Sequence, residues 1–205
     1  AYAVHDFCET PETIPNLLRE AAQYGNEDQV LMFASTSKIT FPGSGVAILV
    51  ASDANIAATK YHLGYQTISY DKINQMRHVK FFGNAQGILE HMKRHAAIIR
   101  PKFEIVTEAL QKLEPLGICT YTDPRGGYFL SLNVMDGCAQ RVYDLAAGAG
   151  VTLTNCGATY PYGKDPHDSN LRIAPTYPSN EELRVAVQIL CLCVRLACLE
   201  KLIEQ

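Results

Sequence analysis

The chain has 205 residues, of which 47% are hydrophobic and 19% are charged, an ordinary globular composition that can bury a core. Its formal net charge is −3 and its pI is about 6.1, so its charge gives no reason to expect a nucleic acid or an anionic membrane as a partner. No secretory signal is recognisable, and Arg184, Gln188 and Arg195 interrupt the most apolar run, which predicts a soluble, cytoplasmic protein.

The cysteines and histidines do not form a metal-binding pattern. Seven cysteines stand at positions 8, 119, 138, 156, 191, 193 and 198, and no two have CxxC spacing. The last three lie among leucines and valines in one predicted helix, which favours buried thiols in a reducing compartment. His91 and His95 are four residues apart, but no third ligand follows at zinc-site spacing. We therefore predict no metal site.

The first part of the chain predicts a helix followed by two strands. PETIPNLLREAAQYG, residues 11–25, has the pattern of an amphipathic helix that ends at Gly25. VLMFAS (30–35) and VAILVAS (46–52) are apolar runs typical of buried strands, with a turn around FPGSG between them. Two such strands predict a sheet covered on both faces, as in α/β proteins.

Two further helices are predicted after these strands. SDANIAATKYHLG starts with Ser52 as a candidate N-cap and has Gly64 just past its expected end. The longest helical pattern covers residues 84–113 and contains Pro101, which removes a backbone donor and predicts a kink or a break. A long bent helix of this kind often links two domains.

The remaining sequence predicts an α+β unit. Its expected elements are two strands joined by DPRGG within 118–134, a helix at 138–150, strands at 151–156 and 171–175, and a C-terminal helix from 179. Ser179 and Glu182 form a capping-box pattern at the start of that last helix. A domain boundary is expected near residues 76–84, which separates residues 1–75 from residues 76–205.

The turn STSKITFPGSGV, residues 35–46, carries a candidate site. Ser35 and Ser37 offer hydroxyl donors at a strand end, and Gly43 and Gly45 let the backbone approach a ligand. Lys38 lies between these elements, so a phosphate and a reactive carbonyl would both fit. The spacing alone does not exclude a simple hairpin with a surface lysine.

Four segments together resemble a known family. STSKITFPGSGV, AYAVHDF, PRGGYFLSLN and YGKDPHDSNLRIAPTYPS occur in the order found in fold-type I pyridoxal-phosphate (PLP) aminotransferases, and most resemble the branch described as MocR-like or aspartate aminotransferase subgroup 1c. The resemblance covers the whole chain and maps onto the C-terminal half of such an enzyme. It implies that residues 1–75 are the C-terminal part of the PLP-binding large-domain sheet, and that residues 76–205 are a long bent linking helix and an α+β small domain.

The resemblance also implies roles for five residues. Lys38 matches the lysine that forms a Schiff base with the cofactor aldehyde, and Ser35 and Ser37 match hydroxyls beside the cofactor phosphate. Tyr2 matches a tyrosine that hydrogen-bonds the cofactor's ring oxygen, and Arg172 matches the arginine that binds the substrate α-carboxylate. From the residues alone, Tyr2 is also compatible with a buried core tyrosine, and Arg172 with a strand-end ion pair.

Two features depart from the family pattern. Many relatives have Gly-x-Arg after the lysine, whereas Gly43-Ser44-Gly45 has no cation for the phosphate. The aspartate that pairs with the pyridine nitrogen would precede Tyr2 by three residues, which places it upstream of Ala1. We therefore expect the 205 residues alone to be inactive, and residues 1–50 to dimerise, swap or be marginally stable.

The function implied by the resemblance is transfer of an amino group between an amino acid, expected to be aspartate or another dicarboxylic one, and a 2-oxo acid, by a homodimer. Lys164 could reach a side-chain carboxylate, although a solvated loop lysine is the simpler interpretation. The alternatives are a PLP-sensing effector domain of a MocR-type transcription regulator and a PLP lyase or decarboxylase on the same fold.

Overall fold

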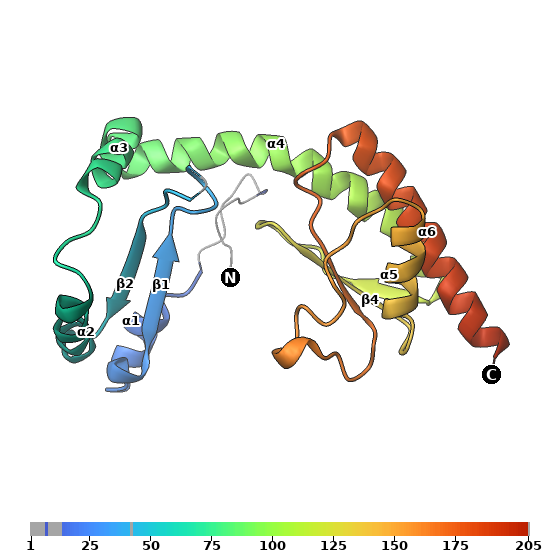
Figure 1. Ribbon diagram of the computed structural model, residues 1–205, viewed down its shortest axis with the longest axis horizontal. Coiled ribbons are helices and arrows are strands. Elements are labelled where there is room, and N and C mark those ends of the chain that lie inside the picture. The colour runs from blue at the N-terminus through green and yellow to red at the C-terminus, as the bar shows by residue number, and fades with distance from the viewer. Residues whose placement is uncertain (1–6, 8–13, 42, 205) are drawn as a thin grey trace. The chain divides into compact units, whose positions relative to one another are not determined.

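A computed structural model describes residues 7, 14–41 and 43–204 of the chain (Figure 1). The chain divides into two compact units, Glu9–His95 and Ala1–Cys8 with Ala96–Gln205. This division falls inside a helix, about twenty residues after the boundary expected at residue 75. The assignment of residues 1–75 to a PLP-binding domain stays a prediction.

The unit Glu9–His95 contains a hairpin and several helices. Its elements are α1 (Leu17–Ala22), the 3-10 turn η1 (Glu27–Gln29), β1 (Leu31–Ser35), β2 (Ala47–Ala51), α2 (Asp53–Gln66), α3 (Lys72–Phe82) and the first part of α4 (Ala85–Gln111). β1 and β2 pair antiparallel, with Leu31 opposite Ala51 and Ser35 opposite Ala47. Both strands form where the apolar runs predict them.

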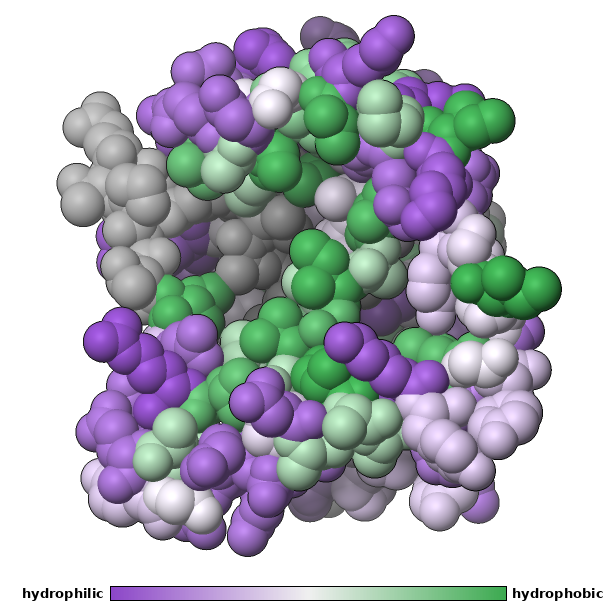
Figure 2. All heavy atoms as spheres, turned by 90° about the vertical axis from the view of Figure 1, so that its left-hand side faces the viewer, coloured by the Kyte–Doolittle hydropathy of each residue, from purple (hydrophilic) through white to green (hydrophobic). Residues whose placement is uncertain are grey.

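The two strands are much more exposed than predicted. Phe33 on β1 is 78% exposed and Ile48 on β2 is 55% exposed, so the expected coverage of both faces is not found within the described residues. Figure 2, viewed from the side of β1, β2 and α2, shows hydrophobic side chains at the surface. The hairpin therefore exposes more apolar surface than a buried strand pair would, as far as the described residues cover it.

The helices of this unit differ from the prediction in their bounds. α1 begins after Asn16, whose side chain accepts a hydrogen bond from the Arg19 N–H, and it is shorter than predicted because this cap lies well inside the expected span. α2 begins after the predicted cap Ser52 and continues two residues past Gly64. α3 was not predicted, although Asp71 caps it by accepting from the Asn74 N–H.

The unit that starts at Ala96 is the predicted α+β unit. Besides the second part of α4, its elements are η2 (Glu114–Leu116), β3 (Cys119–Tyr121), β4 (Leu130–Val134), α5 (Ala139–Gly148), η3 (Pro161–Gly163), β5 (Asn170–Ile173) and α6 (Asn180–Ile203). The strands form one antiparallel sheet in the order β3-β4-β5. The predicted capping box of α6 is present, with Ser179 and Glu182 bonded reciprocally. The mixed α/β architecture is confirmed.

The sheet has one core face and one polar face. Leu130, Leu132 and Leu171 are almost fully buried against α4, α5 and α6, and form the centre of the hydrophobic core. Because side chains alternate along a strand, the residues between them point the other way. Arg172 lies opposite Ser131 in the register, so both belong to the polar face.

Two expectations for this unit need correction. Residues 151–156 form no strand in the described chain: Val151 and Leu153 pack against the core, but the segment has no strand partner. Alternating apolar side chains can thus be buried against the core in a segment that makes no strand-to-strand hydrogen bonds. α4 runs unbroken through Pro101, so the break considered for this proline does not occur, because tertiary packing of buried neighbours such as Phe103 supports the helix.

The described cysteines are thiols and mostly inside the protein. Cys119, Cys138, Cys193 and Cys198 are buried, Cys156 and Cys191 are half-buried, and none is in a disulfide. Burial, together with the nearby Cys198, raises the pKa of Cys138 to about 11.

No group of three or more potential metal ligands occurs among the described residues. In the same part of the chain, no helix is both long and apolar enough to cross a bilayer.

Candidate functional site

The turn between β1 and β2 presents Lys38 at the surface. The Thr36 N–H donates to the Val46 carbonyl over 2.9 Å, and the Val46 N–H donates to the Thr36 hydroxyl oxygen over 2.8 Å. These two bonds close the base of the turn. Ile39, the next residue after Lys38, is only 4% exposed and anchors the turn, while Lys38 itself is exposed. The lysine is therefore accessible on a well-anchored loop.

Two hydroxyls stand together at the start of this turn. The Ser35 hydroxyl donates to the Ser37 oxygen over 3.0 Å, and the Ser37 N–H lies 3.4 Å from the Ser35 oxygen. Ser35 and Gly45 also line a cavity of about 840 Å³ beside the hairpin. Hydroxyl and amide donors next to an open cavity suit an anion such as a phosphate. Lys38 directly follows Ser37 in the chain.

Gly45 lies so close to Ser37 that the turn favours a residue without a side chain at this position. A Cβ atom at Gly45 would lie 2.8 Å from the Ser37 hydroxyl oxygen and 3.1 Å from the Ser37 backbone nitrogen. The turn therefore brings the backbone of Gly45 close to Ser37, the residue before Lys38, so that any side chain at position 45 would force the Ser37 hydroxyl and backbone to shift.

If this turn holds the phosphate of PLP, as the family resemblance implies, replacing Gly45 by alanine in the full-length protein is expected to weaken PLP binding by about tenfold or more, because the new methyl group must move the Ser37 hydroxyl and shift its backbone. The matched control is Gly64→Ala in α2, where an added Cβ meets no atom within 4 Å. That change should stabilise the protein by about 0.5–1 kcal/mol, since alanine favours a helix over glycine. PLP titration followed by absorbance, and thermal melting, measure the two effects. Equal PLP affinity in both variants would contradict the assignment of this turn.

Arg172 lies on the polar face of the other sheet. Its guanidinium carbon is 4.6 Å from the centroid of the Phe129 ring, so the planar group is held over an aromatic surface. Its Nε is buried and has no hydrogen-bond partner among the described residues. A buried guanidinium nitrogen without a hydrogen-bond partner is unusual. The planar guanidinium as a whole has the geometry to bind a carboxylate through two hydrogen bonds.

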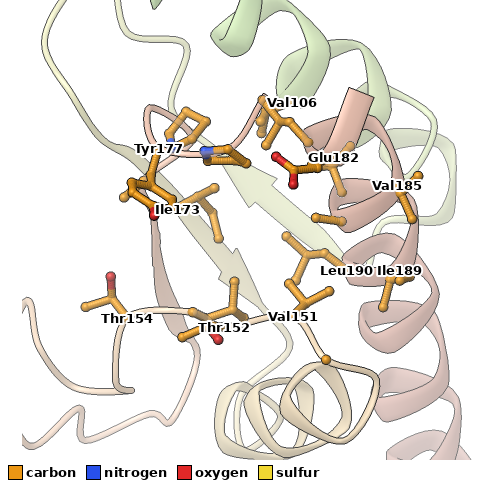
Figure 3. Close-up of a pocket in the computed structure, with 18 of the residues that line it drawn as sticks. Val106, Val151, Thr152, Thr154, Ile173, Tyr177, Glu182, Val185, Ile189 and Leu190 are labelled. Atoms are coloured by element: carbon orange, nitrogen blue, oxygen red, sulfur yellow. The ribbon is translucent and has the colours of Figure 1, made fainter. Parts of the chain in front are cut away.

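Figure 3 shows an apolar cavity of the same unit, which has a volume of about 940 Å³. Arg172 is one of its lining residues. Val106 from α4, Val151 and the α6 residues Val185 and Leu190 line it, and Figure 3 shows their side chains around the same space. The carboxylate of Glu182 also faces this cavity, but it is bonded to the Ser179 N–H as part of the helix cap. The cavity lining is therefore mainly hydrophobic.

The structure groups some of the predicted site residues and leaves others apart. Ser35, Ser37 and Lys38 lie together on one turn, whereas Arg172 belongs to the other compact unit. Tyr2 lies outside the described residues. Lys164 is exposed in the loop after η3.

Sequence reasoning missed the side chains that contact the turn from a distance. The Asn74 side chain donates to the Ser44 carbonyl over 2.8 Å, and the His78 ring meets Thr36 and Thr40. His91, considered only as a metal ligand, donates through Nε2 to the Ile39 carbonyl over 2.7 Å. No local sequence pattern predicts these contacts, because the residues that make them are 30 to 52 positions apart.

Curated relatives of this chain are aminotransferases. The aspartate aminotransferase of Corynebacterium glutamicum is 44% identical over 203 residues, which are 98% of this chain and 46% of the relative. A Mycolicibacterium smegmatis protein whose name places it among the aminotransferases is 47% identical over 204 residues, which are 99% of this chain and 48% of that protein. The chain thus spans about half the length of the curated relatives it matches.

The solved structures that this chain resembles are also aminotransferases. The crystal structure of an aspartate transaminase from C. glutamicum matches with a TM-score of 0.94 and 40% identity, over 98% of this chain and 48% of that chain. LysN, the α-aminoadipate aminotransferase of Thermus thermophilus complexed with N-(5'-phosphopyridoxyl)-L-leucine, matches with a TM-score of 0.76 and 23% identity, over 97% of this chain and 49% of that one. At that identity the likeness shows the fold alone.

A family model described as aspartate amino-transferase matches residues 1–205. The order of the four sequence segments, the fold and this match agree. The chain therefore belongs to the aspartate amino-transferase family, within the PLP-dependent aminotransferases of fold-type I.

Proposed function

We propose that the full-length protein containing this chain is a PLP-dependent aminotransferase that acts on aspartate or another dicarboxylic amino acid and a 2-oxo acid. The observation that carries the proposal is the turn on which an exposed Lys38 follows two hydrogen-bonded serines, Ser35 and Ser37, and on which Gly45 approaches Ser37 closely. The identity to an aspartate aminotransferase supports the choice of substrate.

The described residues fit the cofactor. PLP supplies an aldehyde and an electron-withdrawing ring when it is bound. Lys38 would hold the aldehyde carbon as a Schiff base, and Ser35 and Ser37 would donate hydrogen bonds to the phosphate. The Gly45 backbone leaves room at this position that a side chain would fill.

Lys38 and Arg172 would act on the substrate. The Lys38 amine, once neutral and released, would accept the proton from the substrate Cα as a general base and would then, as a general acid, deliver it to the C4′ carbon of the cofactor. The Arg172 guanidinium can bind the substrate α-carboxylate through two parallel charge-assisted hydrogen bonds. Tyr2 is proposed to hydrogen-bond the cofactor ring oxygen.

The 205 residues by themselves are proposed to be inactive, and the full-length protein to work as a cytoplasmic homodimer. The exposure of Phe33 and Ile48 on the hairpin supports a need for further protein around β1 and β2.

The direct test is an assay of the full-length protein with PLP, aspartate and 2-oxoglutarate, in which oxaloacetate formation is followed. We expect turnover by the full-length protein and none measurable by the 205-residue chain. A full-length protein that binds PLP but releases only ammonia or carbon dioxide would instead indicate the lyase or decarboxylase alternative. The relatives described above are named as aminotransferases, so no observation favours the regulator alternative.

A further inference from the structure

We infer that His78, assisted by His91, is a positioning residue that holds the turn carrying Lys38 in its reactive geometry. This inference rests on the proposed function, because the proposed function gives the turn a catalytic purpose. The contacts of His78 and His91 with the turn lie wholly within the described part of the unit Glu9–His95.

His78 is a buried polar side chain that reaches the turn from α3. It is 7% exposed, and its Nε2 lies 3.1 Å from the Thr36 hydroxyl and 3.0 Å from the Thr40 hydroxyl. These two threonines stand two residues before and two residues after Lys38. One imidazole nitrogen therefore contacts both sides of the lysine.

The other ring nitrogen determines how the hydrogen bonds run. His78 Nδ1 is 2.9 Å from the Asn74 backbone carbonyl, which can only accept, so Nδ1 carries a hydrogen. In the neutral imidazole, Nε2 is then the acceptor. Thr40 has a second acceptor in the Thr36 carbonyl, 2.9 Å away, so we assign the Nε2 contact to the hydrogen of Thr36.

This arrangement connects His78 to the base of the turn. The Thr36 hydroxyl that donates to His78 also accepts the Val46 N–H. The ring thereby fixes the Thr36 side chain in the orientation that closes the turn. A buried donor or acceptor that lost its partner here would favour opening of the turn.

His91 supports the same turn from α4. Its Nε2 donates to the carbonyl of Ile39, the residue that follows Lys38. The rings of Phe81 and Phe82 lie edge-on to His91, with centroids 5.3 and 5.4 Å from its ring. Two histidines on two helices thus hold the backbone around one exposed lysine.

A merely structural histidine would also be buried and hydrogen-bonded, so the test must separate stability from positioning. His78→Leu in the full-length protein removes the acceptor, whereas His78→Gln keeps an amide oxygen that can reach the Thr36 hydroxyl. Thr36→Val removes the same bond from the other side. His62→Leu on α2 is the control, because His62 is exposed.

Three quantities are measured for each variant. Amide hydrogen exchange over residues 36–46 in the PLP-free protein reports opening of the turn. The rate at which added PLP becomes fixed to Lys38 by borohydride reports the geometry of the amine. The melting temperature reports global stability.

We expect His78→Leu to speed exchange over residues 36–46 and to slow fixation of PLP, each by about tenfold. In His78→Gln, the exchange rate and the rate of PLP fixation should return most of the way to those of the unchanged protein. Thr36→Val should show the same faster exchange and slower fixation as His78→Leu, and His62→Leu should change neither rate. The inference is overturned if His78→Leu lowers only the melting temperature, or if His78→Gln is no better than His78→Leu. If His78→Leu does not fold, Thr36→Val and His78→Gln decide by the same criteria.

The outcomes also separate this inference from the proposed function. Failure of the unchanged protein to fix PLP at Lys38 refutes the proposed function, and with it the catalytic purpose of the turn. Fixation by the unchanged protein with the same rate in His78→Leu refutes only the positioning role.

Discussion

Replacement of Lys38 by alanine in the full-length protein is expected to lower aminotransferase activity by about 1,000-fold or more. The change removes both the amine that would hold PLP and the group that would move the substrate Cα proton, and positioned proton transfer alone contributes about 100- to 10,000-fold. The absorption band of lysine-bound PLP should disappear, and borohydride should no longer fix the cofactor to the protein.

The matched control is Lys60→Ala on α2, because Lys60 is exposed like Lys38 but lies outside the turn. Its activity and absorption spectrum should equal those of the unchanged protein. The assignment of Lys38 fails if the K38A protein keeps the band, or if borohydride labels a peptide that does not contain residue 38.

Replacement of Arg172 by lysine is expected to lower kcat/KM for aspartate by roughly 100-fold, with most of the change in KM. Lysine keeps the positive charge but cannot make two parallel hydrogen bonds to a carboxylate, and it cannot stack on Phe129 in the same way. Loss of one partner from a buried, hydrogen-bonded charge pair costs about 2–5 kcal/mol, which is consistent with this range.

A kinetic comparison of two substrates locates the effect. The R172K protein should lose affinity equally for dicarboxylic and monocarboxylic amino acids, because both carry the α-carboxylate. The control Arg184→Lys, an exposed position on α6, should leave KM unchanged. A selective loss for dicarboxylic substrates would assign Arg172 to the side-chain carboxylate instead.

The elements that the sequence predicts well have local causes. β1 and β2 follow their apolar runs, α2 begins after Ser52, and α6 begins after the Ser179–Glu182 capping box. Each depends on residues within a few positions of one another, whose backbone preferences operate before any tertiary contact forms. The candidate site was identified in the same way, because Ser35, Ser37 and Lys38 are neighbours in the chain.

The errors have a common cause in contacts between distant segments. Residues 151–156 have the alternation of a strand but pair with no strand among the described residues, and α4 continues through Pro101 without the break that was one of the two outcomes predicted there. The apolar runs of the hairpin predict burial, yet burial depends on what covers them, and Phe33 remains 78% exposed. Local patterns do not contain this information.

The amino-acid sequence by itself determined the family and the elements whose caps and apolar patterns are local, and it is the source of the proposal that Lys38, Ser35 and Ser37 form the site. Only the tertiary structure revealed that α3, a helix absent from the prediction, brings Asn74 and His78 against the lysine turn from thirty or more residues away. The reason is physical. A cap is stabilised by neighbours in the chain, whereas a hydrogen bond between Thr36 and His78 exists only after the chain has folded and buried the His78 ring beside the turn.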